Sequence, residues 1–334
     1  MPLRSLLLAP LAALGAALAC PAVAAPAVAA NAGFTVVQAA DPKGPPITVG
    51  VWYPTNAPTK LMDLGIGQHA VAAGAPLVGD HLPLIVMSHG NGGFFGGHAD
   101  TAQALAEAGF VVAALTHTGD NYADQSRATD MANRPRQLSV LIDYMLKASP
   151  MQAAIDPDRV GAFGFSSGGF TVLAAAGGAP DLTTVASHCK AHPDFFDCKL
   201  TASNPPPADA AKSVWTHDAR IKAVVSAAPA MGYAFTKAGL SEVTLPLQLW
   251  RAENDEILPD PFYASTVRAN LPTEPEWHVV PGAGHFDFLT PCNAKGLAEA
   301  AFICTSAPGF DRAAFHKDFD AKVVKFFKAN LARP

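Results

Sequence analysis

The stretch from Arg159 to Gly169, RVGAFGFSSGG, constrains the fold of this chain more than any other part of the sequence. Its apolar first half is typical of a short buried strand, and the small residues that follow predict a tight turn into a helix. Side chains at Gly164 and Gly168 would collide with the neighbouring chain, so glycine is required on both sides of Ser166. We expect a strained backbone at Ser166, with the hydroxyl clear of the sheet. The pattern G-x-S-x-G is that of a nucleophile elbow, and a glycine-rich turn without chemistry is the alternative.

Apolar strands that alternate with helical segments predict a parallel sheet around this turn. Residues 82–88, LPLIVMS, form a continuous apolar run, as expected for a strand buried on both faces. Residues 133–147 carry their apolar side chains on one helical stripe. The series therefore predicts an α/β fold, a mostly parallel central sheet with helices on both faces. Further strands are expected at 110–115, 221–226, 245–250 and 276–280, and further helices at 100–108, after the turn, and at 313–329.

Two regions depart from this alternation. Residues 34–40 and 47–53 are alternating runs joined by DPKGPP, which predicts an antiparallel hairpin at the N-terminal edge of the sheet. The small-residue-rich segment 54–80 is interpreted as an irregular surface loop. Residues 177–218 interrupt the strand–helix series and are predicted to form a lid-like insertion over the site. Together these features predict a single domain from residue 31 to residue 334.

The N-terminus has the composition of a signal peptide. Arg4 supplies a positive charge, residues 6–18 are apolar, and Ala22-Val23-Ala24 fits a cleavage site. A second A-x-A sequence follows, so we expect cleavage after residue 24 or as late as residue 30. The apolar run is too short for a stable membrane span. Cys20 matches a lipid-acceptor sequence poorly, which leaves lipid anchoring as the less favoured alternative. An exported protein, periplasmic or secreted, is expected.

Charge and size limit the classes of partner. The formal net charge is −5, whereas nucleic acids and anionic membranes call for a basic face. Nucleic acid is therefore not expected as a partner. A chain of 334 residues, half of them apolar, is long enough to bury one large core. We expect a protein that can act as a monomer.

Outside the leader, the cysteines are Cys189, Cys198, Cys292 and Cys304. An even number in an oxidising compartment predicts disulfides. Short loops favour the pairs Cys189–Cys198 and Cys292–Cys304, although four cysteines allow three pairings. Metal binding by the first pair together with His188 and His192 is the alternative, but their spacing matches no zinc signature. No metal site is predicted.

A serine hydroxyl needs an adjacent base, and the base needs an orienting carboxylate. His285, in PGAGHF, follows the last expected strand and is the candidate base. Asp255, in AENDEILP, follows the preceding strand and is the candidate acid, in competition with Glu253 and Glu256. In parallel sheets the carboxyl ends of the strands meet at one edge, so we expect Ser166, Asp255 and His285 to lie together there. An unrelated, solvated loop histidine is the alternative for the base.

Two further sets of residues are candidates for substrate contacts. The glycine-rich loop 89–93, HGNGG, follows a buried strand, so the backbone N–H groups of Asn91 and Ser167 are the candidate donors to an oxyanion. Side chains near these loops are candidates for a substrate pocket, although each could instead belong to the core, and His117 and Asp120 could instead cap a helix. The pocket candidates are Phe94, Phe95, His117, Trp250 and Phe286.

These residues resemble the α/β-hydrolase superfamily over nearly the whole chain after the leader. The loop 88–93, the elbow 164–169 and the edge hairpin are similar to an exported dienelactone-hydrolase-like group, which itself resembles platelet-activating-factor acetylhydrolases and bacterial polyester hydrolases. The resemblance implies a Ser-His-Asp carboxylesterase that needs no cofactor and acts on a small-molecule or polymeric ester. Dienelactone hydrolase proper uses a cysteine nucleophile, and Ser166 in that place favours plain ester hydrolysis over lactone specificity. A serine peptidase or amidase and a non-catalytic binding protein are the alternatives.

Overall fold

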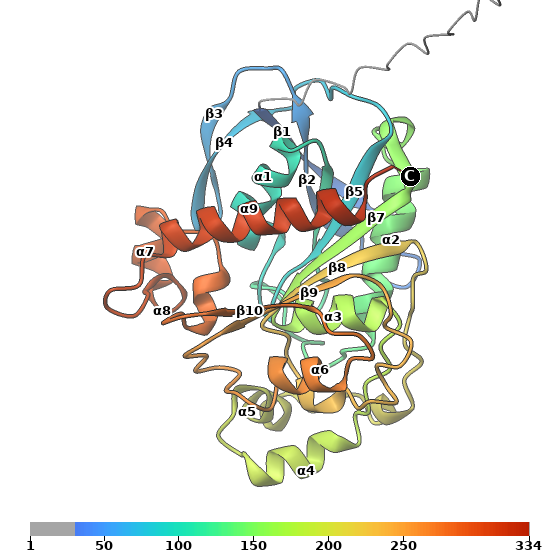
Figure 1. Cartoon of the computed structure of the whole chain (residues 1–334), viewed down its shortest axis with the longest axis vertical. Helices are drawn as coiled ribbons and strands as arrows, with labels where there is room; N and C mark the ends of the chain where they lie inside the picture. The colour runs from blue at the N-terminus through green and yellow to red at the C-terminus, as the bar shows by residue number, and fades with distance from the viewer. Residues whose placement is uncertain (1–30, 334) are drawn as a thin grey trace, which may run out of the picture.

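The computed structural model describes residues 31–333, which form one ten-stranded sheet with helices on both faces (Figure 1). The expected signal peptide, its cleavage sites and Cys20 lie outside the described residues. The strand order across the sheet is β10-β9-β8-β7-β5-β6-β2-β1-β4-β3. The strands are β1 (Asn31–Ala39), β2 (Ile47–Thr55), β3 (Lys60–Leu64), β4 (Gly67–Ala73), β5 (Leu82–Ser88), β6 (Val111–Thr116), β7 (Ile155–Phe165), β8 (Ile221–Ala227), β9 (Leu247–Ala252) and β10 (Glu276–Val280).

The central part of the sheet is parallel, as predicted. Every neighbouring pair from β10 to β6 runs parallel, and all seven residues of β5 are buried, as the continuous apolar run requires. β2 then pairs antiparallel with both β6 and β1. The expected α/β fold with antiparallel strands at its N-terminal edge is therefore confirmed.

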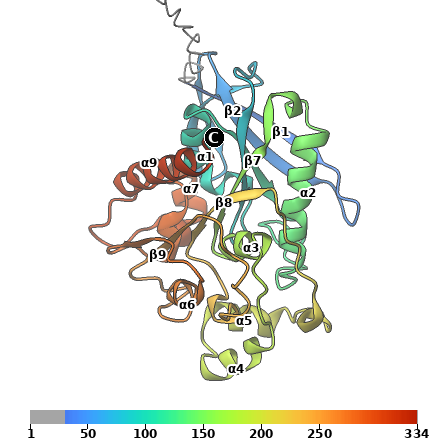
Figure 2. The same ribbon diagram turned by 45° about the vertical axis from the view of Figure 1, so that its right-hand side comes forward.

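Helices cover both faces of this sheet (Figures 1 and 2). On one face lie α2 (Asn133–Lys147) and α3 (Ser167–Ala175), and the expected stripe of α2 is fully buried against the strands. On the other face, α1 (Ala99–Glu107) packs beside α9 (Arg312–Asn330), which buries Phe319 and Phe327. The remaining helices are α4 (Thr184–Ala191), α5 (Phe196–Ser203), α6 (Ala264–Asn270), α7 (Ala294–Glu299) and α8 (Ala301–Cys304), with 3₁₀ turns η1 (Phe95–His98), η2 (Gln152–Ala154), η3 (Ala210–Lys212), η4 (Gly232–Ala234) and η5 (His285–Phe288).

The prediction of an irregular loop over residues 54–80 is wrong. β3 and β4 form an antiparallel hairpin there, and β4 also pairs in parallel with β1, so the sheet continues beyond the expected edge hairpin. β3 is largely exposed on both sides, and β4 consists mainly of small residues, so neither strand shows a strong apolar alternation. β4 joins the sheet through its contact with β1, which is distant in sequence, and propensity does not register such contacts.

The insertion at residues 177–218 contains α4, α5 and η3, which lie at the lower end of the molecule in Figure 1 near α3 and α6. One disulfide, Cys189–Cys198, joins α4 to α5, and a second, Cys292–Cys304, encloses α7 and ends in α8. The two bonds fit an oxidising environment. The sulfur atoms of Cys189 and Cys198 are bonded to each other and are therefore not available as metal ligands in this structure. Within residues 31–333, no helix has both the length and the apolarity needed to cross a membrane.

Candidate active site

The turn at Ser166 has the strained geometry that its glycines predict. β7 ends at Phe165 and α3 begins at Ser167, while Ser166 itself has φ 57° and ψ −118°. A Cβ atom on Gly164 would lie 2.0 Å from the carbonyl oxygen of Gly168, and one on Gly168 would lie 1.9 Å from the carbonyl oxygen of Ser88. Both glycines are therefore required by the close approach of backbone segments.

Hydrogen bonds on both sides of Ser166 hold this strained turn in place. Its N–H donates to the carbonyl of Ala227 at the end of β8, at 2.9 Å. Its carbonyl accepts from the N–H of Ala230, at 3.0 Å, and from that of Phe170, at 3.1 Å. The neighbouring strand and the following helix together fix a conformation that an isolated residue would rarely adopt.

Ser166, His285 and Asp255 lie together at the carboxyl ends of the strands. His285 Nε2 is 3.1 Å from Ser166 Oγ, and His285 Nδ1 is 2.8 Å from Asp255 Oδ2. A carboxylate accepts hydrogen bonds, so Nδ1 carries the proton and the lone pair of Nε2 faces the serine hydroxyl. All three residues are buried, with exposed fractions of 8%, 1% and 7% for serine, histidine and aspartate. This arrangement is able to remove a proton from the serine hydroxyl.

The three acidic residues after β9 have separate roles in the structure. Asp255 Oδ1 accepts hydrogen bonds from the N–H groups of Ile257 and Leu258, at 3.1 and 2.6 Å, which leaves Oδ2 for the imidazole. Glu256 accepts from the backbone N–H of His285, at 3.1 Å. Glu253 accepts from the N–H of Gly282, at 2.9 Å. Only Asp255 reaches the imidazole ring.

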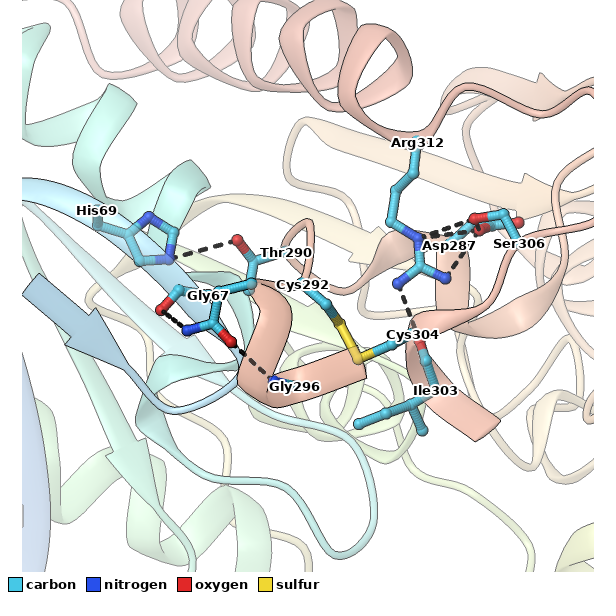
Figure 3. The surroundings of a disulfide bond; sticks show 11 residues. Gly67, His69, Asp287, Thr290, Cys292, Gly296, Ile303, Cys304, Ser306 and Arg312 are labelled. Atoms are coloured by element: carbon cyan, nitrogen blue, oxygen red, sulfur yellow. Dashed lines mark hydrogen bonds and ion pairs between the residues drawn. A yellow bond between two sulfur atoms is a disulfide. The ribbon is translucent and has the colours of Figure 1, made fainter. Parts of the chain in front are cut away.

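Hydrogen bonds of Asp287 hold the turn that carries His285 against the start of α9. Arg312 Nε, at the start of α9, lies 3.0 Å from Asp287 Oδ1, and Ser306 Oγ donates to the same oxygen at 2.5 Å. Figure 3 shows Arg312 pointing toward Asp287 and Ser306 beside the disulfide Cys292–Cys304. Asp287 is thus occupied by these partners, and it lies within η5, where its Oδ2 also accepts from the N–H of Gly284 at 2.8 Å.

The two candidate oxyanion donors lie on adjacent segments. Within residues 31–333, neither the N–H of Asn91 nor that of Ser167 has a protein acceptor. Ser167 is the first residue of α3, where helix N–H groups are free to bind an anion. Gly90 packs directly against Ser166, since a Cβ atom on Gly90 would lie 3.2 Å from Ser166 Cβ. The loop 89–93 therefore lies beside the turn at Ser166, and each of these two segments supplies one free N–H donor.

A buried arginine connects these two segments. Asp120 Oδ1 accepts from Asn91 Nδ2, at 2.8 Å, and from the N–H of Gly92, at 2.9 Å, while Asp120 Oδ2 pairs with Arg134. Arg134 Nε donates to Thr171 Oγ1 on α3, at 3.0 Å, and the guanidinium also donates to the carbonyl of His89. Asp120 is one of the candidates for substrate contact, but its carboxylate instead bonds to the loop 89–93 and holds the conformation of that loop.

A cavity of about 240 Å³ opens beside Ser166 and Ser167. Its other walls come from the insertion at 177–218, from residues 128–131, and from the loops after β8 and β9. Apart from a few hydroxyl groups and one carboxylate, the lining is apolar, as in most small-molecule sites. The apolar lining includes Met131, Leu182, Val185, Phe196, Leu200, Pro206, Pro207, Met231 and Leu258.

None of the five side chains suggested for the substrate pocket lines this cavity. His117 is fully buried, with Nε2 2.8 Å from Ser88 Oγ and Nδ1 2.7 Å from Gln137 Oε1. Burial, reinforced by the nearby Arg134 charge, holds the pKa of His117 well below its ordinary value.

The four aromatic side chains also have other neighbours. Trp250 is buried and stacks on His278 with ring centroids 4.0 Å apart. Phe94 and Phe95 pack against each other, and Phe286 packs against Phe302 at a separate cavity. The residues that line the cavity were missed because most belong to the insertion, whose sequence shows no periodicity that would indicate which side chains face the serine.

Comparisons with known proteins fit this architecture. Residues 98–203, about a third of the chain, match the model of the prolyl oligopeptidase family (Peptidase_S9); the match includes Ser166 but ends before Asp255 and His285. A solved structure of a ferulic acid esterase from Streptomyces cinnamoneus is similar with a TM-score of 0.60, 20% identity, and coverage of 93% of this chain and 96% of that chain. No curated protein matches the sequence significantly. The chain therefore has the α/β-hydrolase fold.

Proposed function

We propose that this chain is a serine hydrolase that cleaves carboxylic esters through an acyl-enzyme. The observation that carries the proposal is the hydrogen-bonded series Asp255–His285–Ser166, with separations of 2.8 and 3.1 Å, beside an apolar cavity. A nucleophile, a base and an orienting acid in this order are what acyl transfer requires. The similarity in fold to a ferulic acid esterase supports an ester as substrate.

In the proposed mechanism, Ser166 Oγ attacks the ester carbonyl while His285 Nε2 takes its proton. Asp255 holds the imidazole in the required tautomer and stabilises the imidazolium. The N–H groups of Asn91 and Ser167 stabilise the oxyanion, a contribution of about 2.7–4 kcal/mol per donor. His285 then protonates the leaving alcohol, and a water molecule activated by the same histidine releases the acid.

The cavity beside Ser166 would hold the acyl part of the ester. The leaving alcohol must lie next to His285, because Nε2 delivers its proton. The cavity is lined by Ser166 and Ser167, but His285 is not part of its lining. The acyl chain therefore extends into the cavity, and the alcohol lies on the side of the imidazole.

The first test is covalent labelling. We expect a fluorophosphonate probe to modify the wild-type protein at Ser166 and to leave Ser166→Ala unlabelled, with both proteins folded by circular dichroism. Hydrolysis of p-nitrophenyl esters should be lost in the same variant. Equal labelling of both proteins, or absence of labelling and of ester hydrolysis in the wild type, would contradict the proposal. A non-catalytic binding protein, the remaining alternative, would give the latter result.

Amide hydrolysis is the second candidate, because the sequence match is to a peptidase family. The same three side chains would serve a peptidase or amidase, and the leaving amine would take its proton from His285. Turnover of p-nitrophenyl esters and of matched p-nitroanilides decides between the two. We expect the esters to be hydrolysed and the anilides to be left largely intact.

We also propose that residues 1–24 direct export and that residues 177–218 act as a lid. The two disulfides support an extracytoplasmic location, and the contribution of the insertion to the cavity wall supports the lid. N-terminal sequencing of protein recovered from the periplasm or the medium would test the first proposal. A mature N-terminus between residues 25 and 31 is expected.

A further inference from the structure

One wall of the acyl cavity carries a charged group. Asp197, on α5 of the insertion, is the only charged side chain among the residues that line the cavity, and it is itself 8% exposed. The neighbouring lining residues on the same helix, Phe196 and Leu200, are apolar. Burying a carboxylate in such a wall is unfavourable unless something compensates it.

Two tyrosine hydroxyls compensate the carboxylate in part. Tyr263 OH donates to Asp197 Oδ1 and Tyr233 OH donates to Asp197 Oδ2, each at 2.9 Å. A carboxylate has about four lone-pair sites, so each oxygen can accept a further hydrogen bond. Burial and the adjacent carboxylate raise the pKa of both tyrosines, so both hydroxyls keep their protons and remain donors.

A counter-charge is missing from this cluster. Within the part of the chain that the structure describes, no lysine or arginine forms an ion pair with Asp197. His188 has a ring nitrogen within 4.8 Å of the carboxylate and stacks on Tyr233, but burial lowers its pKa below the ordinary value. The burial of His188 disfavours its charged form, and the described residues contain no ion pair between His188 and Asp197.

The carboxylate is held rigidly at this wall. The disulfide Cys189–Cys198 ties the residue next to Asp197 to α4. Thr201 Oγ1 donates to the backbone carbonyl of Asp197 at 2.6 Å, and the two tyrosines come from segments outside the insertion. A polar group fixed in this way in an apolar pocket is suited to orient a ligand rather than to move with it.

We infer that Asp197 is a specificity-determining residue that accepts a hydrogen bond from the acyl group of the substrate. This inference rests on the ester hydrolysis proposed above. The acyl group would have an apolar body and a hydrogen-bond donor, such as a phenolic hydroxyl or an ammonium group, on the part that meets α5. A cavity of about 240 Å³ is smaller than the ~300–1,000 Å³ typical of drug-sized ligands, so it suits an acyl group with a single ring.

The experiment compares ethyl esters that differ only at the para position of a 3-phenylpropanoyl group. The substituents are hydroxyl, methyl, which has nearly the same size but donates no hydrogen bond, and aminomethyl, which is protonated at neutral pH. For the wild type we expect kcat/KM to be at least about tenfold higher for the hydroxyl ester than for the methyl ester, because a hydrogen bond to a charged group is lost. The aminomethyl ester separates recognition of a cation from recognition of a neutral donor.

In Asp197→Asn the hydroxyl-to-methyl ratio should fall severalfold, because one carboxylate oxygen becomes an amide nitrogen and the other becomes a neutral acceptor, whereas Leu200→Ala, which alters the same wall without a polar atom, should keep the ratio. A wild-type ratio near one for both donor esters would overturn the inference, and this measurement requires no variant. A uniform loss of activity for all esters in Asp197→Asn would also overturn it, because that is what a purely structural carboxylate predicts. If the wild type hydrolysed no ester at all, the proposed function would fail, and this inference with it.

Discussion

The two oxygens of Asp255 have different partners, and this division sets the geometry of the site. Oδ1 is held by the backbone N–H groups of Ile257 and Leu258, and Oδ2 lies 2.8 Å from His285 Nδ1. The residue therefore positions the imidazole through its own anchoring to the backbone. A neighbouring acid such as Glu256, bonded only to the N–H of His285, cannot replace it.

Asp255→Asn should lower kcat by about 10⁴-fold, because an amide that donates toward Nδ1 favours the wrong imidazole tautomer. The amide oxygen can still accept from the N–H groups of Ile257 and Leu258, so the melting temperature should change little. Glu256→Gln, one residue away, is the control and should retain most of the ester-hydrolysis rate. Similar losses in both variants would show that Asp255 has no special role.

Asp320 lies half-buried on α9, near Asp100 and His316. Burial, reinforced by the charge of Asp100, raises the pKa of Asp320 from 3.8 to about 8. Between these two values the folded protein keeps a proton that the unfolded chain releases, so this group lowers stability progressively as the pH rises from about 4 to about 8.

Asp320→Asn removes this titration, and its amide oxygen can still accept the hydroxyl of Thr101, which lies 2.6 Å from Asp320 Oδ1. We therefore expect the variant to melt at a higher temperature than the wild type near pH 8, with a smaller difference near pH 4. Asp318→Asn, an exposed position on the same helix, is the control and should follow the wild-type curve. Parallel melting curves for wild type and Asp320→Asn across this range would refute the prediction.

At the scale of elements, the strand–turn–helix unit β7–α3 depends on backbone contacts that only glycine permits. A Cβ atom on Gly164 would lie 2.0 Å from the carbonyl oxygen of Gly168, and backbone cannot move aside as a flexible side chain can. The elbow therefore tolerates no side chain at this position.

Gly164→Ala should lower stability by at least about 1–3 kcal/mol, the usual cost of overpacking, and should abolish most activity by displacing Ser166. Gly97→Ala is a suitable control, because the nearest atom to its added Cβ would be Leu289 Cδ2 at 3.6 Å, an ordinary contact. Thermal melting and ester hydrolysis measured on both variants would test this. Wild-type behaviour of Gly164→Ala would contradict the close approach at the elbow.

At the scale of the whole molecule, Arg134 joins segments that are far apart in the sequence. From α2 it reaches the loop after β5 through Asp120 and His89, and it reaches α3 through Thr171, whose hydroxyl donates to the carbonyl of Ser167 at 2.6 Å. The guanidinium thus connects the segments that carry both candidate oxyanion donors. The side chain is 2% exposed, so its contacts are not shared with water.

Arg134→Lys keeps the charge but cannot make contacts in all these directions. We expect kcat to fall about 10- to 100-fold with little change in KM, because misaligned donors affect the transition state more than the bound ester. Arg136→Lys, on the same helix but paired with Asp41 away from the site, should leave both constants nearly unchanged. A change in KM alone for Arg134→Lys would indicate a role in binding instead.

The sequence determined the elements whose signals are local. Three features depend only on residues close together in the sequence: the apolar run of β5, the apolar stripe of α2 and the glycines around Ser166. The structure contains the strand, the helix and the tight turn that these features predict. The sequence also placed Ser166, Asp255 and His285 after the strands β7, β9 and β10, but it left Glu253 and Glu256 in competition with Asp255, and only the hydrogen bonds of the structure separate these three acids. Parallel strands bring their carboxyl ends to one edge whatever the loops contain.

Only the tertiary structure decided what depends on distant contacts. The hairpin β3–β4 becomes part of the sheet by pairing with β1, and His117 and Trp250 become interior side chains because helices and strands close over them. The cavity beside Ser166 and the carboxylate of Asp197 in its wall depend on contacts of α5 with Tyr233 and Tyr263, across more than thirty residues of sequence. Such contacts follow from the three-dimensional packing of segments, which no local pattern of residues encodes.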